Sequence, residues 1–343
     1  MTISSRLALP AVAVAVALLA AGCDSKKGGR PGAATTSRSA TLQSAIAPPK
    51  QNVRIVIITH GQASDAFWAV VKRGIEAAAR DLGVTVAYQA PAAYDPSRMS
   101  RLIDAAVATS PDGLVVSIPD EKYVGPSIRR AVQAGIPVVA INSGEDIFRR
   151  VGALLYVGQP EYAAGFRAGL RMAAAGVRDA ICVNHQVGTS SLVLRCRGFA
   201  AALAKGGGRA RVVTVDFQQR QQTEARIAAA ASASGVDGVL TLGPAGATPA
   251  LKAFASRRLF AKVKLATFDL APDILGALRS RKMLFAIDQQ PYLQGYLPVL
   301  FLTQLKLYGL IPAEGTVVPT GPNFVTPNNA ARVQQLTDAG IRG

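Results

Sequence analysis

Asp65, Phe67 and Trp68 form a short stretch whose residue types suit the binding of a polar ligand. The carboxylate of Asp65 can accept hydrogen bonds from hydroxyl groups, and the two aromatic rings can lie flat against a C–H face. The stretch follows an apolar run and opens a segment with helical spacing, so it stands where a strand ends and a helix begins. The alternative is that Asp65 is only a helix N-cap and that both rings belong to the core.

Further polar side chains close or follow apolar runs elsewhere in the chain, namely Asn142, Asn184, Asp269 and Gln289. Each alone could be a cap or a turn residue. The carboxyl ends of parallel strands converge on one crevice, however, so we expect the set to meet around a ligand. Arg195 lies early in the helix predicted after Asn184, and its charge would balance Asp65 and Asp269 if the three share a cleft.

Both histidines, His60 and His185, fall near strand ends, so either could contact a ligand, although a lone histidine is more often structural. Three signatures of catalysis are absent from the sequence: Gly-x-Gly-x-x-Gly after a strand, a Walker-type phosphate loop and a Gly-x-Ser-x-Gly nucleophile elbow. The cysteines are too few, and too poor in histidine neighbours, for a metal site. We therefore expect a binding protein with no catalytic residue, no cofactor and no metal.

The elements that would position these residues alternate between strand and helix. The strand-like apolar runs are residues 53–59, 84–88, 113–117, 137–141, 180–184, 211–216, 238–242, 264–269 and 284–288. Helical periodicity marks residues 96–108, 124–134, 162–174, 191–204, 224–234 and 272–280. Nearly continuous apolar strands alternating with helices predict parallel sheets covered on both faces, and about nine strands divide naturally into two lobes. The chain would first cross between lobes near residues 156–160, and the Gly- and Pro-rich residues 314–324 suit further crossings.

Residues 1–22 have the pattern of a lipoprotein signal peptide. A basic start precedes an apolar segment too short to span a bilayer, which ends in Leu19-Ala20-Ala21-Gly22-Cys23. This ending resembles the lipobox of bacterial lipoproteins, and the resemblance implies cleavage before Cys23 and lipid on its thiol. Residues 23–52 are rich in Ser, Gly, Pro and basic residues and predict a flexible tether. We expect an exported protein, lipid-anchored on the periplasmic or outer cell-surface side; the alternative is an ordinary secreted protein with a chance cysteine.

The formal net charge of +17 is compatible with nucleic-acid binding, but two observations argue against that class. An exported protein does not meet the nucleic acids of the cell. In addition, the basic residues are scattered along helix faces rather than gathered with aromatic residues. A solvated basic surface is the better interpretation. Cys182 and Cys196 remain as an even pair in an oxidising compartment, so a disulfide between them is plausible.

From residue 53 to about residue 324 the chain resembles the type I periplasmic sugar-binding proteins, the ribose-binding family. The matching stretches occur in the family's order across both lobes and are Asp65-Ala66-Phe67-Trp68, Asp112-Gly113-Leu114-Val115, Gly135-Ile136-Pro137-Val138, Gly188-Thr189-Ser190, Arg195 with Gly198-Phe199, Thr267-Phe268-Asp269 and Asp288-Gln289-Gln290-Pro291.

This resemblance implies an α/β fold of two lobes, each a doubly wound parallel sheet, with ligand bound between them. Three hinge crossings are implied, near Gly158, Gln289 and Val318. The N-terminal lobe would comprise residues 53–158 and 290–319. The C-terminal lobe would comprise residues 159–289 and 320–343.

The resemblance also assigns roles to residues. Asp65 matches a polar contact, and Phe67 and Trp68 match two aromatic positions that sandwich the sugar with a ring from the other lobe, where Phe217 falls. Arg195 and Asp269 match a charged pair that binds hydroxyls, and Gln289 matches an amide near the second crossing.

The chain departs from the ribose binders at two places. Their Asp-Arg pair after the Gly-Ile-Pro strand is replaced by Asn142-Ser143, and an expected Asn after residues 238–242 is replaced by Gly243-Pro244. Both changes remove polar contacts, so ribose itself is in doubt. The residues that could substitute are His60, Gln62, Glu145, Asn184 and Gln290.

The expected function is that of a substrate-binding lipoprotein of an ABC importer. It would be a monomer that binds a small neutral sugar or sugar alcohol and delivers it to a membrane permease. A second hypothesis is a receptor component that presents a sugar or an autoinducer to a membrane sensor. A sugar-responsive repressor shares the fold but needs a helix-turn-helix where the lipobox stands.

Overall fold

The computed structural model describes residues 50–61 and 65–342. The predicted signal peptide, Cys23 and Gln62 lie outside these ranges. Within them, no helix combines the length and the apolar character that crossing a bilayer requires.

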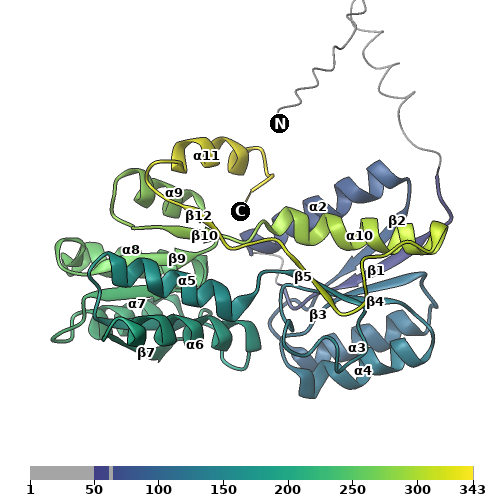
Figure 1. Ribbon diagram of the computed structural model, residues 1–343, viewed down its shortest axis with the longest axis horizontal. Coiled ribbons are helices and arrows are strands. Elements are labelled where there is room, and N and C mark those ends of the chain that lie inside the picture. The colour runs from purple at the N-terminus through teal and green to yellow at the C-terminus, as the bar shows by residue number, and fades with distance from the viewer. Residues whose placement is uncertain (1–49, 62–64, 343) are drawn as a thin grey trace, which may run out of the picture. The chain divides into compact units, whose positions relative to one another are not determined.

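Strands and helices alternate along the chain (Figure 1). The strands are β1 (Arg54–Ile58), β2 (Thr85–Gln89), β3 (Gly113–Ser117), β4 (Val138–Ile141), β5 (Leu155–Gly158), β6 (Asp179–Asn184), β7 (Arg209–Thr214), β8 (Gly238–Thr241), β9 (Lys264–Phe268), β10 (Ala286–Asp288), β11 (Thr316–Pro319) and β12 (Asn323–Val325). The helices are α2 (Ala66–Leu82), α3 (Pro96–Val107), α4 (Glu121–Gln133), α5 (Glu161–Ala174), α6 (Ser190–Lys205), α7 (Arg220–Ala231), α8 (Pro244–Ser256), the 3-10 helix η1 (Leu259–Ala261), α9 (Pro272–Arg279), α10 (Pro291–Tyr308) and α11 (Ala330–Asp338).

The strands form two six-stranded sheets, in the orders β11-β5-β4-β3-β1-β2 and β12-β10-β9-β8-β6-β7. All strand pairings in these sheets are parallel except that of β10 with β12, which is antiparallel. We call the first sheet with its helices the first lobe and the second sheet with its helices the second lobe. The predicted pair of doubly wound α/β lobes is thereby confirmed.

The chain passes between the two sheets three times (Figure 1). The passages follow β5, follow β10 and link β11 to β12. The sequence had indicated crossings at these places but not the short strands β5, β11 and β12 themselves. Each has only three or four residues.

Strands in the middle of each sheet, such as β3, β4, β6 and β8, are buried on both faces, whereas the edge strands β2 and β7 are partly exposed. In β1, Val56 and Ile58 pack with α3 and α4, while Ile55 and Ile57 pack with α2 and α10. In the second sheet, the β6 residue Cys182 packs with α5 and α6, whereas its neighbours face α7, α8 and α9. Burial on both faces explains why these strands read as continuous apolar runs rather than alternating ones.

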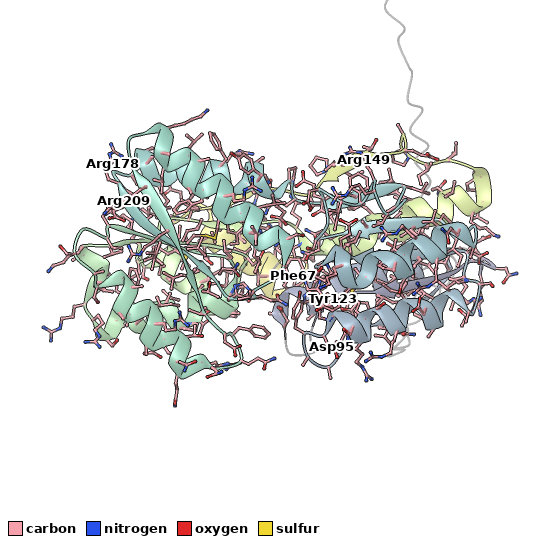
Figure 2. All side chains as sticks on the ribbon, turned by 90° about the horizontal axis from the view of Figure 1, so that it is seen from below. Phe67, Asp95, Tyr123, Arg149, Arg178 and Arg209 are labelled. Carbon is pink, nitrogen blue, oxygen red and sulfur yellow. A yellow bond between two sulfur atoms is a disulfide. The ribbon has the colours of Figure 1, made fainter. Side chains whose placement is uncertain are left out.

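Basic side chains are spread over both lobes. Figure 2 labels Arg178 and Arg209 on the second lobe and Arg149 on the first. Arg209 pairs with Asp179, and Arg149 stacks over Phe148 and bonds the carbonyl of Gly315. This distribution agrees with the solvated basic surface expected from the sequence.

Candidate functional site

A cavity of about 390 Å³ lies where the carboxyl ends of strands from both lobes meet. Its wall contains eight of the residues selected from the sequence: His60, Asp65, Phe67, Trp68, Asn142, Arg195, Phe217 and Asp269. Two others support the wall from behind. Asn184 accepts a hydrogen bond from the backbone of the wall residue Gln186, and Gln289 donates one to Asp269.

Asp65 combines the two roles that the sequence left open. It is the N-cap of α2, since its carboxylate accepts a 2.9 Å hydrogen bond from the backbone N–H of Phe67, and it also lines the cavity. Phe67 and Trp68 meet edge to face, with 5.2 Å between ring centroids, and each is 6% exposed. Both rings therefore pack in the core of the first lobe and also form part of the wall; Figure 2 labels Phe67 at the junction of the lobes.

Asn142 and Asp269 occupy equivalent places in the two lobes. Each directly follows a central strand, β4 or β9, and each has a left-handed backbone with φ of 61°. Asn and Asp tolerate this region better than other non-glycine residues, and such outliers cluster at functional sites. Gln289 joins the two, because it donates to Asp269 over 2.7 Å and accepts a long 3.4 Å hydrogen bond from Asn142.

Burial raises the pKa of Asp269 to about 7, while Arg195 and the hydrogen bond from Gln289 act in the opposite direction. The carboxyl group is therefore poised between its charged and neutral forms near neutral pH. When ionised it is a strong acceptor for a ligand hydroxyl.

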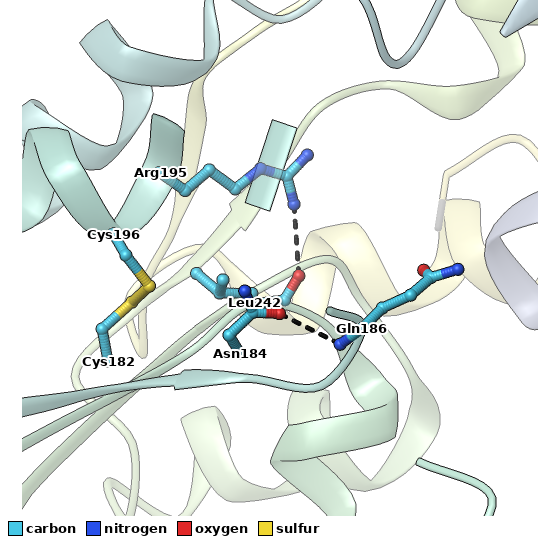
Figure 3. The surroundings of a disulfide bond; sticks show 6 residues. All are labelled: Cys182, Asn184, Gln186, Arg195, Cys196 and Leu242. Carbon is cyan, nitrogen blue, oxygen red and sulfur yellow. Dashed lines mark hydrogen bonds between the residues drawn. A yellow bond between two sulfur atoms is a disulfide. The ribbon is translucent and has the colours of Figure 1, made fainter. Parts of the chain in front are cut away.

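Arg195 is paired with a residue that the sequence analysis did not select. Its guanidinium donates to both oxygens of Glu161, over 2.6 and 2.8 Å, and the two side chains are 3% and 1% exposed. A third bond, of 3.1 Å, reaches the carbonyl of Leu242 (Figure 3). The carboxylate that balances Arg195 directly is therefore Glu161, rather than the expected Asp65 and Asp269.

A disulfide joins Cys182 in β6 to Cys196 in α6, the residue after Arg195, with 5.7 Å between Cα atoms (Figure 3). The bond ties the helix that carries Arg195 to the strand whose end lies at the cavity. It thereby helps to hold the guanidinium in place.

The start of α6 also contacts the first lobe directly. The backbone N–H of Ser190 donates to the carbonyl of Pro119 over 3.1 Å. The hydroxyl of Thr189 donates to the hydroxyl of Tyr94 over 3.3 Å. These contacts bring the lobes together on one side of the cavity.

Beyond the predicted residues, the wall includes His185 and, on α7 and α8, Arg220, Glu224, Thr248 and Lys252. Phe217 and His185 meet edge to face at 6.4 Å between ring centroids. Within residues 50–61 and 65–342, no three His, Cys, Asp or Glu side chains are grouped to hold a metal ion. Hydroxyl acceptors beside aromatic faces make the cavity suited to a polyhydroxylated molecule.

Comparison with known proteins agrees with this geometry. Residues 55–307 match the family described as periplasmic binding protein domain. Among solved structures, a carbohydrate transporter from Acidothermus cellulolyticus 11B in complex with myo-inositol has a TM-score of 0.80 and 35% sequence identity, covering 85% of this chain and 100% of that one.

Two more distant relatives extend the comparison. The xylose/arabinose-binding protein XylF of Sulfolobus acidocaldarius is 25% identical over 325 residues, which cover 86% of this chain and 79% of that protein. A solute-binding protein of an ABC transporter from Burkholderia graminis C4D1M, in complex with D-arabinose, has a TM-score of 0.73 at 23% identity and covers 82% of this chain and 98% of that one.

Proposed function

Because this chain belongs to the periplasmic binding protein domain family, we propose that it is the substrate-binding component of an ABC importer for a small neutral sugar or sugar alcohol. Such proteins bind solutes and are not enzymes. The observation that carries the proposal is the shared cavity, where carboxylates and aromatic rings from both lobes meet. Carboxylates accept hydrogen bonds from hydroxyls, and rings cover the C–H faces of a sugar.

The charges of the inner wall favour a neutral ligand. Arg195 forms a buried salt bridge with Glu161, so its positive charge is already balanced. Asp65 and Asp269, which line the cavity, would repel an anion. The relative of 35% identity was solved with myo-inositol, which makes a cyclitol the first ligand to test.

The test is a calorimetric and thermal-shift screen of the purified protein against myo-inositol, D-arabinose, D-xylose, D-ribose, D-glucose and D-galactose. A ligand at about 100 times its Kd should stabilise the native state by about 2.7 kcal/mol. Trp68, the only tryptophan of the chain, should report binding by a change in emission. Asp65→Asn should weaken the response, because a neutral amide oxygen is the poorer acceptor. Failure of every neutral polyol to bind would contradict the proposal.

We propose further that the protein is a lipoprotein anchored through Cys23 and acting as a monomer beside its permease. The support is the lipobox-like sequence, which lies outside the described residues. Replacing Cys23 by Ser should prevent processing or release the protein from the membrane fraction. The proposed lobe boundaries remain residues 53–158 with 290–319, and residues 159–289 with 320–343.

A further inference from the structure

Both histidines of the 343-residue chain line the same cavity, and they reach it from opposite lobes. His60 follows β1 and His185 follows β6. These strands hold the same place in the two sheet orders, next to β2 and β7 respectively. The two imidazoles are therefore equivalent features of the two lobes.

The hydrogen bonds of His60 favour one tautomer. The hydroxyl of Ser117, a fully buried residue, accepts a 2.9 Å bond from the backbone N–H of His60 and lies 2.7 Å from its ring Nδ1. A hydroxyl that accepts from the backbone still has its own proton to donate, and Nδ1 is the acceptor beside it. Nδ1 is then unprotonated, and we assign the ring proton to Nε2, which is left for the cavity.

A different observation assigns the same tautomer to His185. Among the described residues, its buried Nδ1 has no hydrogen-bond partner. A buried N–H donor without a partner is rarer than a buried acceptor without one, so the proton belongs on Nε2. The imidazole of His185 packs beside Gly243, which has no side chain. A Cβ at this position would lie 3.3 Å from both His185 Cε1 and Asp269 Oδ2 and would crowd the ring.

Both imidazoles are held neutral. Burial lowers the pKa of His60 to about 3. Burial, with the nearby charge of Arg195, lowers the pKa of His185 to about 4. Around the rings stand Ser117, Trp68 and Tyr94 on the first lobe, and Phe217, Arg195 and Asp269 on the second.

We propose that His60 and His185 form a two-lobe clamp, in which each imidazole donates an Nε2 hydrogen bond to an oxygen of the same bound polyol. This inference rests on the proposed function. The carboxylates of Asp65 and Asp269 accept from ligand hydroxyls, whereas the imidazoles donate to hydroxyl oxygens. The clamp therefore selects a ligand with hydroxyls on two opposite edges, as a cyclitol has, and links ligand recognition to closure of the lobes.

Nuclear magnetic resonance of the imidazole rings tests the clamp directly. The untagged full chain, labelled with 15N-histidine and kept in detergent, contains two rings. His60→Phe and His185→Phe assign one spin system each. We expect both rings to be neutral Nε2–H tautomers between about pH 5.5 and 8, and both Nε2 signals to move when myo-inositol or another bound polyol of the screen saturates the protein.

Affinity provides the second measurement. His60→Phe and His185→Phe should each weaken polyol binding by about 3- to 10-fold, the usual range for one neutral hydrogen bond. His185→Gln, which keeps an N–H donor, should recover part of the loss. The melting temperature of each variant without ligand controls for loss of fold.

The outcomes separate this inference from the proposed function. If no neutral polyol binds, both fail. If a polyol binds at proven saturation while one ring signal or both remain unmoved, or while folded His185→Phe keeps wild-type affinity, the clamp is wrong and the proposed function stands.

Discussion

Two residues of the cavity, Asn142 and Asp269, have backbone conformations or protonation properties that are unfavourable for an isolated residue and that the surrounding structure must stabilise. Asn142 and Asp269 keep left-handed backbones at the ends of two strands, and Asp269 keeps a carboxyl group with a pKa raised to about 7. Gln289 bonds to both side chains. Through Gln289, Asn142 of the first lobe and Asp269 of the second are therefore connected at the point where the ligand is expected.

The raised pKa of Asp269 predicts opposite pH dependences for stability and for binding. The folded protein holds a proton on Asp269 that the unfolded chain releases near pH 4, so the contribution of Asp269 to stability should fall as pH rises toward about 7 and then level off. His60 and His185, whose pKa values burial lowers, contribute the opposite slope below about pH 6.5, so the contribution of Asp269 is measured as the difference between the wild type and Asp269→Asn. Affinity for a polyol that donates to the ionised carboxylate should instead rise over the same interval, by up to tenfold per pH unit.

Asp269→Asn is the matched control for this prediction. The amide does not titrate, so calorimetry and urea unfolding of the variant should lose the pH dependence that this residue contributes. Wild-type affinity that stays constant between about pH 5.5 and 8 would contradict the assignment of Asp269 as a ligand acceptor.

At the scale of elements, each lobe contains one helix pair in unusually close contact. In the first lobe α2 packs on α10 through Gly74 and Gly295, and in the second α5 packs on α6 through glycines at equivalent contacts. A Cβ added at Gly295 would lie 2.1 Å from the carbonyl oxygen of Val71. The backbone of the facing helix cannot yield locally, so the two helices would have to separate.

Gly295→Ala should therefore destabilise the protein by about 1–3 kcal/mol, the usual cost of overpacking. Gly276→Ala is the matched control, since Gly276 also lies within a helix, α9, but has no atom within 4 Å of an added Cβ. There the better helix propensity of alanine should stabilise by up to about 1 kcal/mol. Urea unfolding measures both, and equal effects of the two changes would refute the close-contact argument.

The sequence predicted most strands correctly because burial on both faces makes them continuous apolar runs. The helical stretches read from periodicity did not include α8, α10 or α11. In α10, apolar residues occupy the exposed faces of the helix as well as the buried one, as the stretch from Tyr292 to Leu302 shows. The alternation of apolar and polar residues that marks an amphipathic helix is therefore weak. Tertiary packing, rather than a polar face, defines that helix.

The sequence also located most of the cavity, because polar residues at strand ends must converge in this topology. It missed Glu161, which opens α5 directly after a crossing and gives no local sign of burial. The only available signal was indirect: an arginine expected in a closed cleft needs a carboxylate partner. His185 also lies at a strand end, but a lone histidine in the sequence is more often structural, and only the structure places it in the wall of the cavity.

At the scale of the whole fold, the three passages between the sheets are the segments able to change the angle between lobes. The contacts of α6 with the loop at Pro119 join the two lobes in this structure, and the cavity is bounded by residues of both. Opening requires these hydrogen bonds to break. A ligand that bridges the lobes opposes that opening.

Small-angle X-ray scattering should therefore give a smaller radius of gyration with saturating polyol than without it. Asp269→Ala, measured with the same polyol at the same concentration, should keep the larger radius, because it loses a charge-assisted hydrogen bond and about 10- to 150-fold in affinity. An unchanged profile of the wild-type protein at calorimetrically proven saturation would contradict hinge closure.

The three passages also determine the order in which the lobes can be completed during synthesis. The first lobe lacks α10 and the edge strand β11 until nearly all of the second lobe has left the ribosome. The apolar face that Val299 and Leu302 cover stays open until then. The first lobe thus cannot mature until most of the second has been synthesised, unlike multidomain chains whose N-terminal unit folds first. A gene cut between β5 and α5 should therefore yield two incomplete halves rather than two independent lobes.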